Sequence, residues 1–425
     1  MLVPEYDELP YRSSPIEWTA PERLALASLL HGGPRTKRAG YRMLELGCGD
    51  GTNLLALAYF RRHAQFVGVD GSAKHVELGR ARVRELGLGN LHFIHADLRE
   101  LGAQLEGVFE YVVAHGLISW VPDDVRDAVL ALSRTRLADD GLVYLNYNAQ
   151  PGWSVRGLVR RMLLRHTEDI VGLRARTVAA QHAAAQLRAQ LLTSDHPWSQ
   201  LLAGELGLVV EGEASYIAHE YLAPINRCYW RGELRALAEQ HGLEVVTAAD
   251  FDRASGRDIP ELDAWLRDEG LAGPDPLESS DFMRYRQMCS PILAASPWVA
   301  RPMTQGELRG LRLASALMPP ADVSVLPAGF IGAGGQEVEV RDAVLRDVLV
   351  RVQPEWPLSL PLDQLFDGHE VPADDLLLLH RLGLLELRID EPDASVEPGP
   401  LHALELRERG ELTSAYHRRM LPSGA

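Results

Sequence analysis

Residues 41 to about 150 alternate short apolar runs with amphipathic stretches, and this alternation constrains the fold more than any other feature of the chain. A repeated strand-helix order predicts a parallel sheet with helices on both faces. We therefore expect an α/β core with a Rossmann-like, doubly wound sheet. The expected strands are MLEL, QFVGVD, LHFIHAD, YVVAHG and LVYLNYN, and the expected helices cover 53–62, 73–86 and 123–136, with one short helix before YVVAHG.

The regions on either side of these strands differ in composition. Residues 1–40 predict an N-terminal arm followed by a helix that begins near Pro21. Residues 155–220, rich in Ala, Leu, Arg and Gln at helical spacing, predict a helical insertion. At the end of this insertion, the run SYIAHEYL at 215–222 has the composition of a strand. The run LEVVTAADF is expected to return to the same sheet, so that the core extends over 41–255.

The remainder of the chain predicts two further parts. Residues 256–302 are acidic and are expected to be helical. Residues 303–425 combine short strands (RLASAL, QEVEV, LLELRI) with helices at 341–351 and 372–382. Helices followed by a small hairpin indicate a winged-helix-like α+β domain.

Composition excludes several classes of function. The net charge of −16 and the isoelectric point near 5.4 argue against nucleic-acid binding, which needs a basic face. The three cysteines, Cys48, Cys228 and Cys289, are too far apart in sequence for a CxxC metal clasp, and we expect no metal site. Neither a basic-then-apolar leader nor an apolar run of about 18 residues is found, so we expect no membrane insertion and a cytoplasmic location. A homodimer is left open.

The run ELGCGDGTN at 45–53 contains the clearest ligand-binding signal. Gly47, Gly49 and Gly51 let the backbone approach a ligand closely between a strand and the start of a helix. Cys48 is interpreted as a small turn residue, and Asn53 is included in the predicted binding set. Alone, this pattern suits a dinucleotide as well as S-adenosylmethionine.

Acidic residues at three successive strand ends distinguish these two ligands. Glu45 precedes the first glycine, where a carboxylate would accept a hydrogen bond from an ammonium group and would repel a pyrophosphate. Asp70 ends QFVGVD and can accept from both ribose hydroxyls. Asp97 can accept from an adenine amino group while Leu98 packs on the ring. The set, with Gly71 and Ser72, favours S-adenosylmethionine; the alternative is a series of helix N-caps.

The fourth and fifth strand ends are expected to face the methyl group. His115, Gly116 and Trp120 follow the fourth strand and are assigned to the cofactor, His115 also to the acceptor, although a structural histidine is an open alternative. After the fifth strand, the stretch YNAQPGW turns from apolar to polar. Here Tyr147, Asn148 and Trp153 are the predicted acceptor-positioning residues, with plain packing as the alternative for Tyr147 and Trp153.

Several blocks together resemble one bacterial group, the class I methyltransferases that carry a methyltransferase regulatory domain and include protein lysine methyltransferases acting on outer-membrane proteins. The blocks that carry the resemblance are YDELPY at 6–11, ELGCGDGTN, AHGLISWVP, YNAQPGW and AHEYL at 218–222. The resemblance implies dependence on S-adenosylmethionine and methyl transfer to a lysine of a protein or peptide. Ala149 and Gln150 replace Thr and Tyr of the related motif, and Pro224 to Cys228 replace an Asn-Glu-Pro segment, which leaves the acceptor open.

Two other functions fit the same residues. A small-molecule or peptide-carboxylate methyltransferase would use a basic pocket, which Arg156, Arg160 and Arg161 could supply. A non-catalytic protein that senses the cofactor would act through the C-terminal domain.

Overall fold

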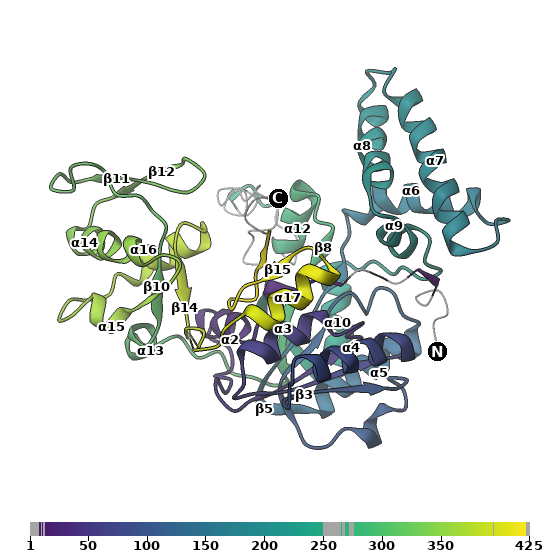
Figure 1. The fold of residues 1–425 in the computed structure, drawn as a ribbon. Coiled ribbons are helices and arrows are strands. Elements are labelled where there is room, and N and C mark those ends of the chain that lie inside the picture. The colour runs from purple at the N-terminus through teal and green to yellow at the C-terminus, as the bar shows by residue number, and fades with distance from the viewer. Residues whose placement is uncertain are drawn as a thin grey trace.

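The structure is a computed structural model of the chain, and it describes residues 8–9, 11, 13–249, 265, 268–271, 276–393 and 395–421. Figure 1 shows a central α/β unit, a group of helices (α6 to α9) that projects from it, and a C-terminal lobe of short strands and helices. The last part of the chain, drawn in yellow, leaves this lobe and returns to the central unit.

A seven-stranded sheet with strand order β3-β2-β1-β4-β5-β9-β7 forms the central unit. β1 to β5 are parallel, whereas β9 is antiparallel to both β5 and β7. The predicted doubly wound sheet and the return of the LEVVTA strand to it are confirmed. The bounds are β1 Arg42–Leu46, β2 Gln65–Asp70, β3 Leu91–His95, β4 Phe109–Ala114, β5 Leu137–Leu145, β7 Leu243–Ala248 and β9 Pro291–Ala295.

Residues 288–295 form strands where the sequence predicted helix, and that part of the prediction was wrong. β8 (Met288–Cys289) pairs with β6 (Tyr147–Asn148), and β9 lies between β5 and β7. Ile292, Leu293 and Ala294 are all buried, so β9 has both faces covered. A short run that is apolar on both faces has no periodicity by which a strand could be told from a helix. The helix α12 (Pro276–Arg284) agrees with the prediction, and residues 250–264 lie outside the described part of the chain.

Helices cover both faces of the sheet, as predicted. One apolar cluster joins α2, α3 and α4 to Phe66, Tyr111 and Tyr144 of the sheet. A second cluster joins α5 and α10 to Leu44 and Val112 on the opposite face. The bounds are α2 Pro21–Leu30, α3 Thr52–Phe60, α4 Ala73–Glu85, α5 Asp123–Thr135 and α10 Arg231–Gln240, with short 3-10 helices at Glu17–Thr19 and Leu101–Gln104.

The projecting helices α6 to α9 confirm the predicted helical insertion and have a small apolar core of their own. SYIAHEYL, however, is helical: it forms most of α9, and the predicted strand was wrong. Ile217, Ala218 and Tyr221 are buried at a spacing of three to four residues, and this helical burial outweighs the strand propensity of Tyr and Ile. The bounds are α6 Trp153–His166, α7 Leu173–Leu191, α8 Pro197–Glu211 and α9 Ala214–Tyr221.

The C-terminal lobe contains the helices and strands expected there. A three-stranded sheet, β13-β10-β14, and a separate hairpin, β11-β12, accompany the helices. The winged-helix assignment stays a prediction. The bounds are α13 Gln305–Arg309, β10 Arg312–Ala314, β11 Ala328–Ile331, β12 Glu337–Val340, α14 Ala343–Val352, a 3-10 helix Gln353–Glu355, β13 Leu360–Pro361, α15 Leu362–Leu365, α16 Ala373–Arg381 and β14 Glu386–Arg388.

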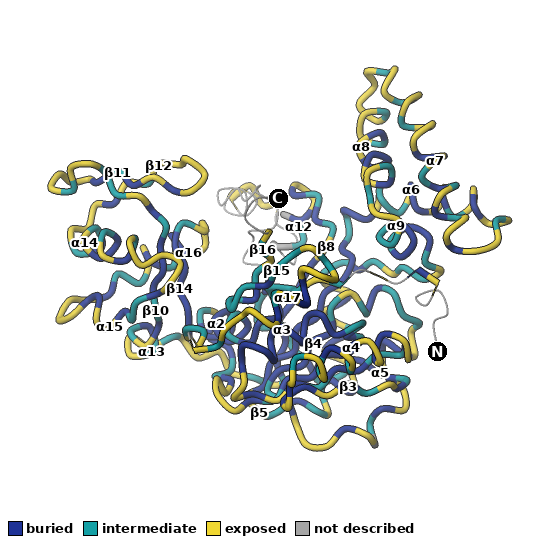
Figure 2. Tube along the Cα trace, in the orientation of Figure 1, coloured by how far each residue is buried: buried dark blue, intermediate teal, exposed yellow. Residues whose placement is uncertain are grey.

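Residues 397–421, called the C-terminal segment below, pack on the central unit. They form α17 (Gly399–Glu408) and a hairpin of β15 (Leu412–Thr413) and β16 (Arg419–Met420). Beneath them, all nine residues of α3 are buried, as the dark blue trace in Figure 2 shows. A helix that is apolar on every side is stable only when it is covered on every side. The C-terminal segment therefore completes the core around α3.

Among the residues with described positions, none of the helices has the length and apolar character needed to cross a bilayer.

Candidate active site

The glycine turn between β1 and α3 adopts backbone angles that only glycine accepts without strain. Gly47, Gly49 and Gly51 have φ values of 72°, 54° and 75°. A Cβ atom on Gly51 would lie 2.1 Å from the Phe93 ring, so a side chain there would force this ring to move. Cys48 is buried within the turn, and burial raises the pKa of its thiol well above the ordinary value. This position is consistent with the interpretation of Cys48 as a small residue of the turn.

Glu45 is a buried carboxylate at the end of β1. Its Oε1 accepts a hydrogen bond of 3.0 Å from Asn53 Nδ2, whereas Oε2 is buried without a hydrogen-bond partner in the described part of the chain. Burial raises the pKa of Glu45 to about 8; the Asn53 hydrogen bond opposes this shift, and the charges of Asp50 and Asp70 add to it. A cationic ligand group at Oε2 would compensate for the cost of this burial.

Asp70 connects the glycine turn to the end of β2. One carboxylate oxygen accepts from the backbone N–H of Gly49 at 2.9 Å, and the other accepts from Ser72 N–H at 2.8 Å. Ser72 caps α4, and the Gly71 carbonyl lies 3.1 Å from His95 Nε2. The predicted residues Asp70, Gly71 and Ser72 are thus brought to the same edge of the sheet as the glycine turn.

Asp97 lies beyond β3, at the rim of this edge. It forms a 2.6 Å ion pair with Arg99, which also contacts Asp124 at 2.7 Å. The hydrogen bonds from Arg99 hold the pKa of Asp97 below its ordinary value. Leu98 is buried beside it. Because β1, β2 and β3 are parallel neighbours, their ends bring Glu45, Asp70 and Asp97 together with the glycine turn; we call this set the carboxylate half of the site.

The ends of β4 and β5 meet at a group of polar side chains that includes one residue absent from the predicted set, Asn146. His115 Nδ1 lies 3.0 Å from the Tyr144 hydroxyl, and the two rings stack with centroids 5.9 Å apart. Asn146 Oδ1 accepts a short hydrogen bond from Gly116 N–H, and its Nδ2 lies 3.5 Å from His115 Nε2. Burial lowers the pKa of His115 to about 4, so its imidazole is neutral at physiological pH.

The sequence analysis selected Asn148, the second asparagine of YLNYN, and therefore missed Asn146, the first. The available signal was that Asn146 is the first polar side chain after the apolar run of the fifth strand, and in the structure β5 indeed ends at Leu145. Tyr147, by contrast, belongs to the apolar cluster on one face of the sheet, with its ring 5.9 Å from Tyr229 in an edge contact. Burial, with a contribution from Cys289, raises the pKa of Tyr147 well above its ordinary value.

Asn148 and the two tryptophans occupy the neighbouring surface. Asn148 N–H donates to Ser119 Oγ at 2.9 Å, and its Nδ2 donates to Asn226 Oδ1 at 3.3 Å. The rings of Trp120 and Trp153 meet edge to face at 5.9 Å. Trp153 is buried at the first turn of α6. We call His115, Asn146, Asn148, Trp120 and Trp153 the amide half of the site.

Helix α9 brings the AHEYL block and the N-terminal arm together near the site. His219 Nε2 lies 2.6 Å from the Leu9 carbonyl, and its ring makes an edge contact with Tyr11. The neighbouring carboxylate of Glu220 is half-buried; burial raises the pKa of Glu220 to about 7 against the charges of Arg156 and Arg160. The other residues of the arm block, including Tyr6, Asp7 and Pro10, lie outside the described part of the chain.

The arginines proposed for a basic pocket are largely engaged elsewhere. Arg156 pairs with Glu205 at 3.3 Å and places its guanidinium over the Trp153 ring at 5.4 Å. Arg160 donates to the Ala223 carbonyl, and Arg161 is exposed. No group of three metal-ligating side chains is found among the residues that the structure describes.

Comparison with known proteins identifies the central unit. Residues 43–141 match the family described as a methyltransferase domain. RP789 of Rickettsia prowazekii is 33% identical over 241 residues, which are 57% of this chain and 43% of RP789. RP028 of the same organism is 29% identical over 52% of this chain and 88% of its own length. The chain therefore spans less than half of RP789 and most of RP028.

A solved structure extends this likeness to almost the whole chain. PKMT2, a protein lysine methyltransferase from Rickettsia typhi solved in complex with AdoHcy, superposes with a TM-score of 0.80. The match covers 97% of this chain and 86% of that one at 20% identity. At this identity the likeness shows the fold, and the predicted class I methyltransferase fold is confirmed.

Proposed function

We propose that this chain transfers the methyl group of S-adenosylmethionine to a lysine side chain of a protein or peptide. The observation that carries the proposal is Glu45: a buried carboxylate with one oxygen held by Asn53 and the other without a partner in the described chain, directly under a glycine turn. An α-ammonium group is the ligand that this oxygen fits. A pyrophosphate, the other ligand of glycine turns, would be repelled there.

The residues of the carboxylate half would hold the cofactor. Glu45 would accept from its ammonium group, Asp70 from the ribose hydroxyls, and Asp97 from the adenine amino group, with Leu98 against the ring. When bound, S-adenosylmethionine supplies an electrophilic methyl group on a sulfonium. The protein therefore has to align the acceptor and exclude water, and no nucleophilic side chain is required.

The amide half suits a neutral amine acceptor. A lysine has a reference pKa of about 10.4 and must lose a proton before it can attack. The buried surroundings disfavour the charged form, while amide oxygens and the Trp120–Trp153 pair can hold the amine and its alkyl chain. His115, with its pKa lowered to about 4, is a weak base and is better suited to fixing Asn146 than to taking the proton.

The likeness to PKMT2 over 97% of the chain supports a protein acceptor. The carboxylate-methylating alternative has less support, because Arg156 is paired with Glu205 and Arg160 is bonded to a backbone carbonyl. Of the three arginines, only the exposed Arg161 would be left to meet a carboxylate acceptor.

Labelling separates these functions. The full chain is incubated with S-adenosylmethionine carrying an isotopic methyl group and with protein fractions of a bacterial lysate, including outer-membrane proteins, and Glu45→Gln serves as the inactive control. We expect alkali-stable label on lysine, identified by mass spectrometry. Alkali-labile label would indicate carboxylate methylation. Cofactor binding without transfer to any fraction would favour the sensing protein, and absence of binding would overturn the proposal.

A further inference from the structure

The C-terminal segment reaches the predicted cofactor site from the opposite end of the sequence. It is anchored on α3 and α4 by the Tyr59 hydroxyl, which donates to the Glu397 carbonyl at 2.7 Å, and by the Arg82–Glu408 ion pair at 2.7 Å. Arg407 pairs with Glu85 at 2.9 Å at the exposed edge of the same contact. The hairpin that follows α17 is thereby laid over the start of α3.

His417, in the turn of this hairpin, contacts Asn53 directly. Its side chain is 1% exposed, and its Nε2 lies 2.7 Å from Asn53 Oδ1. Because an amide oxygen only accepts hydrogen bonds, the contact requires the proton on Nε2. Burial lowers the pKa of His417 well below its ordinary value, so the ring is neutral. Its Nδ1 is buried without a hydrogen-bond partner among the described residues, so a proton there would be an unpaired buried donor, and the tautomer with the proton on Nε2 is favoured.

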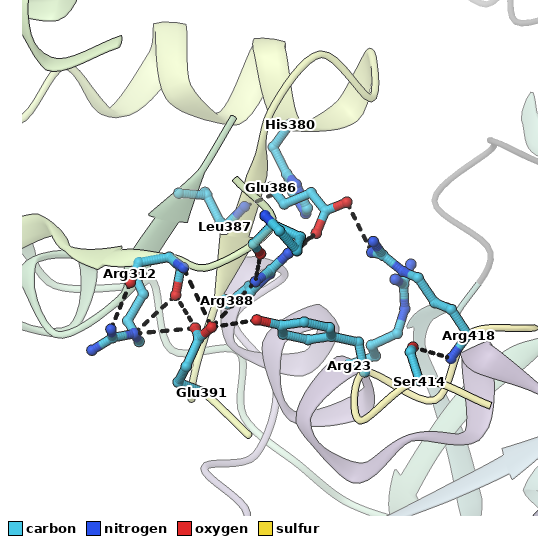
Figure 3. A network of polar contacts seen from close by, with 12 residues as sticks. Arg23, Arg312, His380, Glu386, Leu387, Arg388, Glu391, Ser414 and Arg418 are labelled. Atoms are coloured by element: carbon cyan, nitrogen blue, oxygen red, sulfur yellow. Dashed lines mark hydrogen bonds and ion pairs between the residues drawn. The ribbon is translucent and has the colours of Figure 1, made fainter. Parts of the chain in front are cut away.

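The residues on either side of His417 are fixed by the C-terminal lobe and the N-terminal arm. Figure 3 shows Arg418 reaching Glu386 of β14, at 2.9 Å, and Arg418 also pairs with Glu17 at 2.8 Å. The Tyr416 hydroxyl donates to Glu391. These contacts line a cavity of about 340 Å³ between the lobe and α2. The hairpin turn is thus held from both sides, which fixes the position of the imidazole.

Asn53 transmits this contact to Glu45. Its Oδ1 accepts from His417 and, at 2.9 Å, from the backbone N–H of Ile16, and this leaves Nδ2 to donate to Glu45 Oε1 at 3.0 Å. The Thr19 hydroxyl, 3.0 Å from Nδ2, can donate or accept and so favours neither orientation of the amide. A rotated amide would direct its oxygen at the Glu45 carboxylate and its NH₂ group at two donors. The donors at Oδ1 therefore select the one amide orientation in which Glu45 is held with Oε2 left for a ligand.

We infer that His417 is a positioning residue for the cofactor: it fixes the Asn53 amide, which fixes the Glu45 carboxylate that receives the ammonium group of S-adenosylmethionine. The inference rests on the proposed function. It gives the C-terminal segment a role in cofactor binding besides covering α3. Because Ile16 N–H also holds Asn53 Oδ1, removal of His417 weakens the arrangement without abolishing it.

A double-mutant cycle on the full chain tests the inference, with S-adenosylmethionine affinity measured by isothermal titration calorimetry. His417→Ala should weaken binding about tenfold, as expected for the loss of one buried hydrogen bond. Asn53→Ala should weaken it at least as much, and the double variant should be no weaker than Asn53→Ala alone. With a methyl acceptor, kcat at saturating cofactor should stay within about twofold of the wild type, because the loss lies in ground-state binding.

His402→Ala is the matched control. His402 is a histidine of the same segment whose Nε2 lies 3.0 Å from the Thr413 carbonyl, within the segment itself. The His402→Ala substitution removes a comparable hydrogen bond and should leave cofactor affinity unchanged. His417→Gln, whose amide can donate to Asn53, should recover most of the affinity, and it decides the question if His417→Ala does not fold.

The outcomes separate this inference from the proposed function. Additive losses in the cycle, equal losses for His402→Ala and His417→Ala, or a folded His417→Gln as weak as His417→Ala would each overturn the inference while the function stands. Failure of the wild-type chain to bind S-adenosylmethionine would overturn both.

Discussion

The carboxylate half and the amide half of the site are built in different ways. Glu45, Asp70 and Asp97 come from one continuous stretch of the chain, and each is placed by the end of its own strand. The amide half draws on segments far apart: Asn146 Nδ2 lies 3.0 Å from Met288 Sδ, and Asn148 contacts Asn226. The backbone of the side proposed for the cofactor is thus set by local chain geometry, and a distant segment reaches it through the contact of His417 with Asn53. The side proposed for the acceptor depends throughout on how distant segments pack.

The largest expected effect is on the carboxylate half. Glu45→Gln keeps the shape of the side chain and removes its charge, so S-adenosylmethionine affinity should fall by about a hundredfold or more, as for other buried charge pairs that lose one partner. Calorimetry measures this loss. A change smaller than about threefold would mean that Glu45 does not receive the ammonium group and would break the distinction between the two halves.

Cofactor affinity should also depend on pH through the same residue. The pKa of Glu45 is raised to about 8 in the ligand-free chain, so below pH 8 the carboxyl must lose a proton to pair with an ammonium group. Affinity should then fall about tenfold for each pH unit below 8. Above pH 8 it should stop rising, because the α-amino group of the cofactor itself loses its proton near pH 8. Glu45→Gln should show a flat profile below pH 8; an equally steep one would assign the dependence to another group.

On the amide half, Asn146→Ala should reduce turnover more than Asn148→Ala. Asn146 contacts both Gly116 N–H and His115 at the ends of β4 and β5, whereas the Asn148 side chain bonds only to Asn226 among the described hydrogen bonds. We expect a loss in kcat of about tenfold to a hundredfold for Asn146→Ala, with cofactor affinity within about threefold. Equal losses in kcat and cofactor affinity would show that Asn146 serves the whole site as scaffold.

The smallest effect is expected at the rim. Arg99 is an exposed residue that pairs with Asp97 and Asp124. Arg99→Ala should leave the midpoint of chemical denaturation almost unchanged, as for other surface ion pairs, and should change cofactor affinity by less than about threefold. Chemical denaturation measures the first value and calorimetry the second. A larger loss of affinity would mean that the Arg99–Asp97 pair at the rim also contributes to cofactor binding.

The sequence predicted what is determined locally. The alternation of strands and helices gave β1 to β5 and the helices between them, and with them the positions of Glu45, Asp70 and Asp97. It showed Asn146 only as the first polar residue after the apolar run and could not rank it above Asn148, because that choice depends on where β5 ends and on β8, which comes much later in the chain. The sequence also could not predict α9 as a helix. Its Tyr and Ile residues have strand propensity, and only the packing of Ile217 and Tyr221 in the folded chain favours the helix.

The sequence likewise could not identify the segment that covers α3. The run TNLLALAYF is apolar on all sides, and this was a visible sign that something must cover its outer face. Which segment does so is decided by contacts such as Tyr59 with Glu397 and Asn53 with His417, each of which joins an early part of the sequence to its last part.

The position of β9 between β5 and β7 has a consequence for how the chain folds during synthesis. Until the ribosome has made residue 295, β5 is an edge strand with unpaired backbone groups, and until the C-terminal segment emerges, α3 has an uncovered apolar face. Contacts of such long sequence separation form late and slowly. We therefore expect the nascent chain to expose aggregation-prone surface until residues 291–295 and the C-terminal segment have been made.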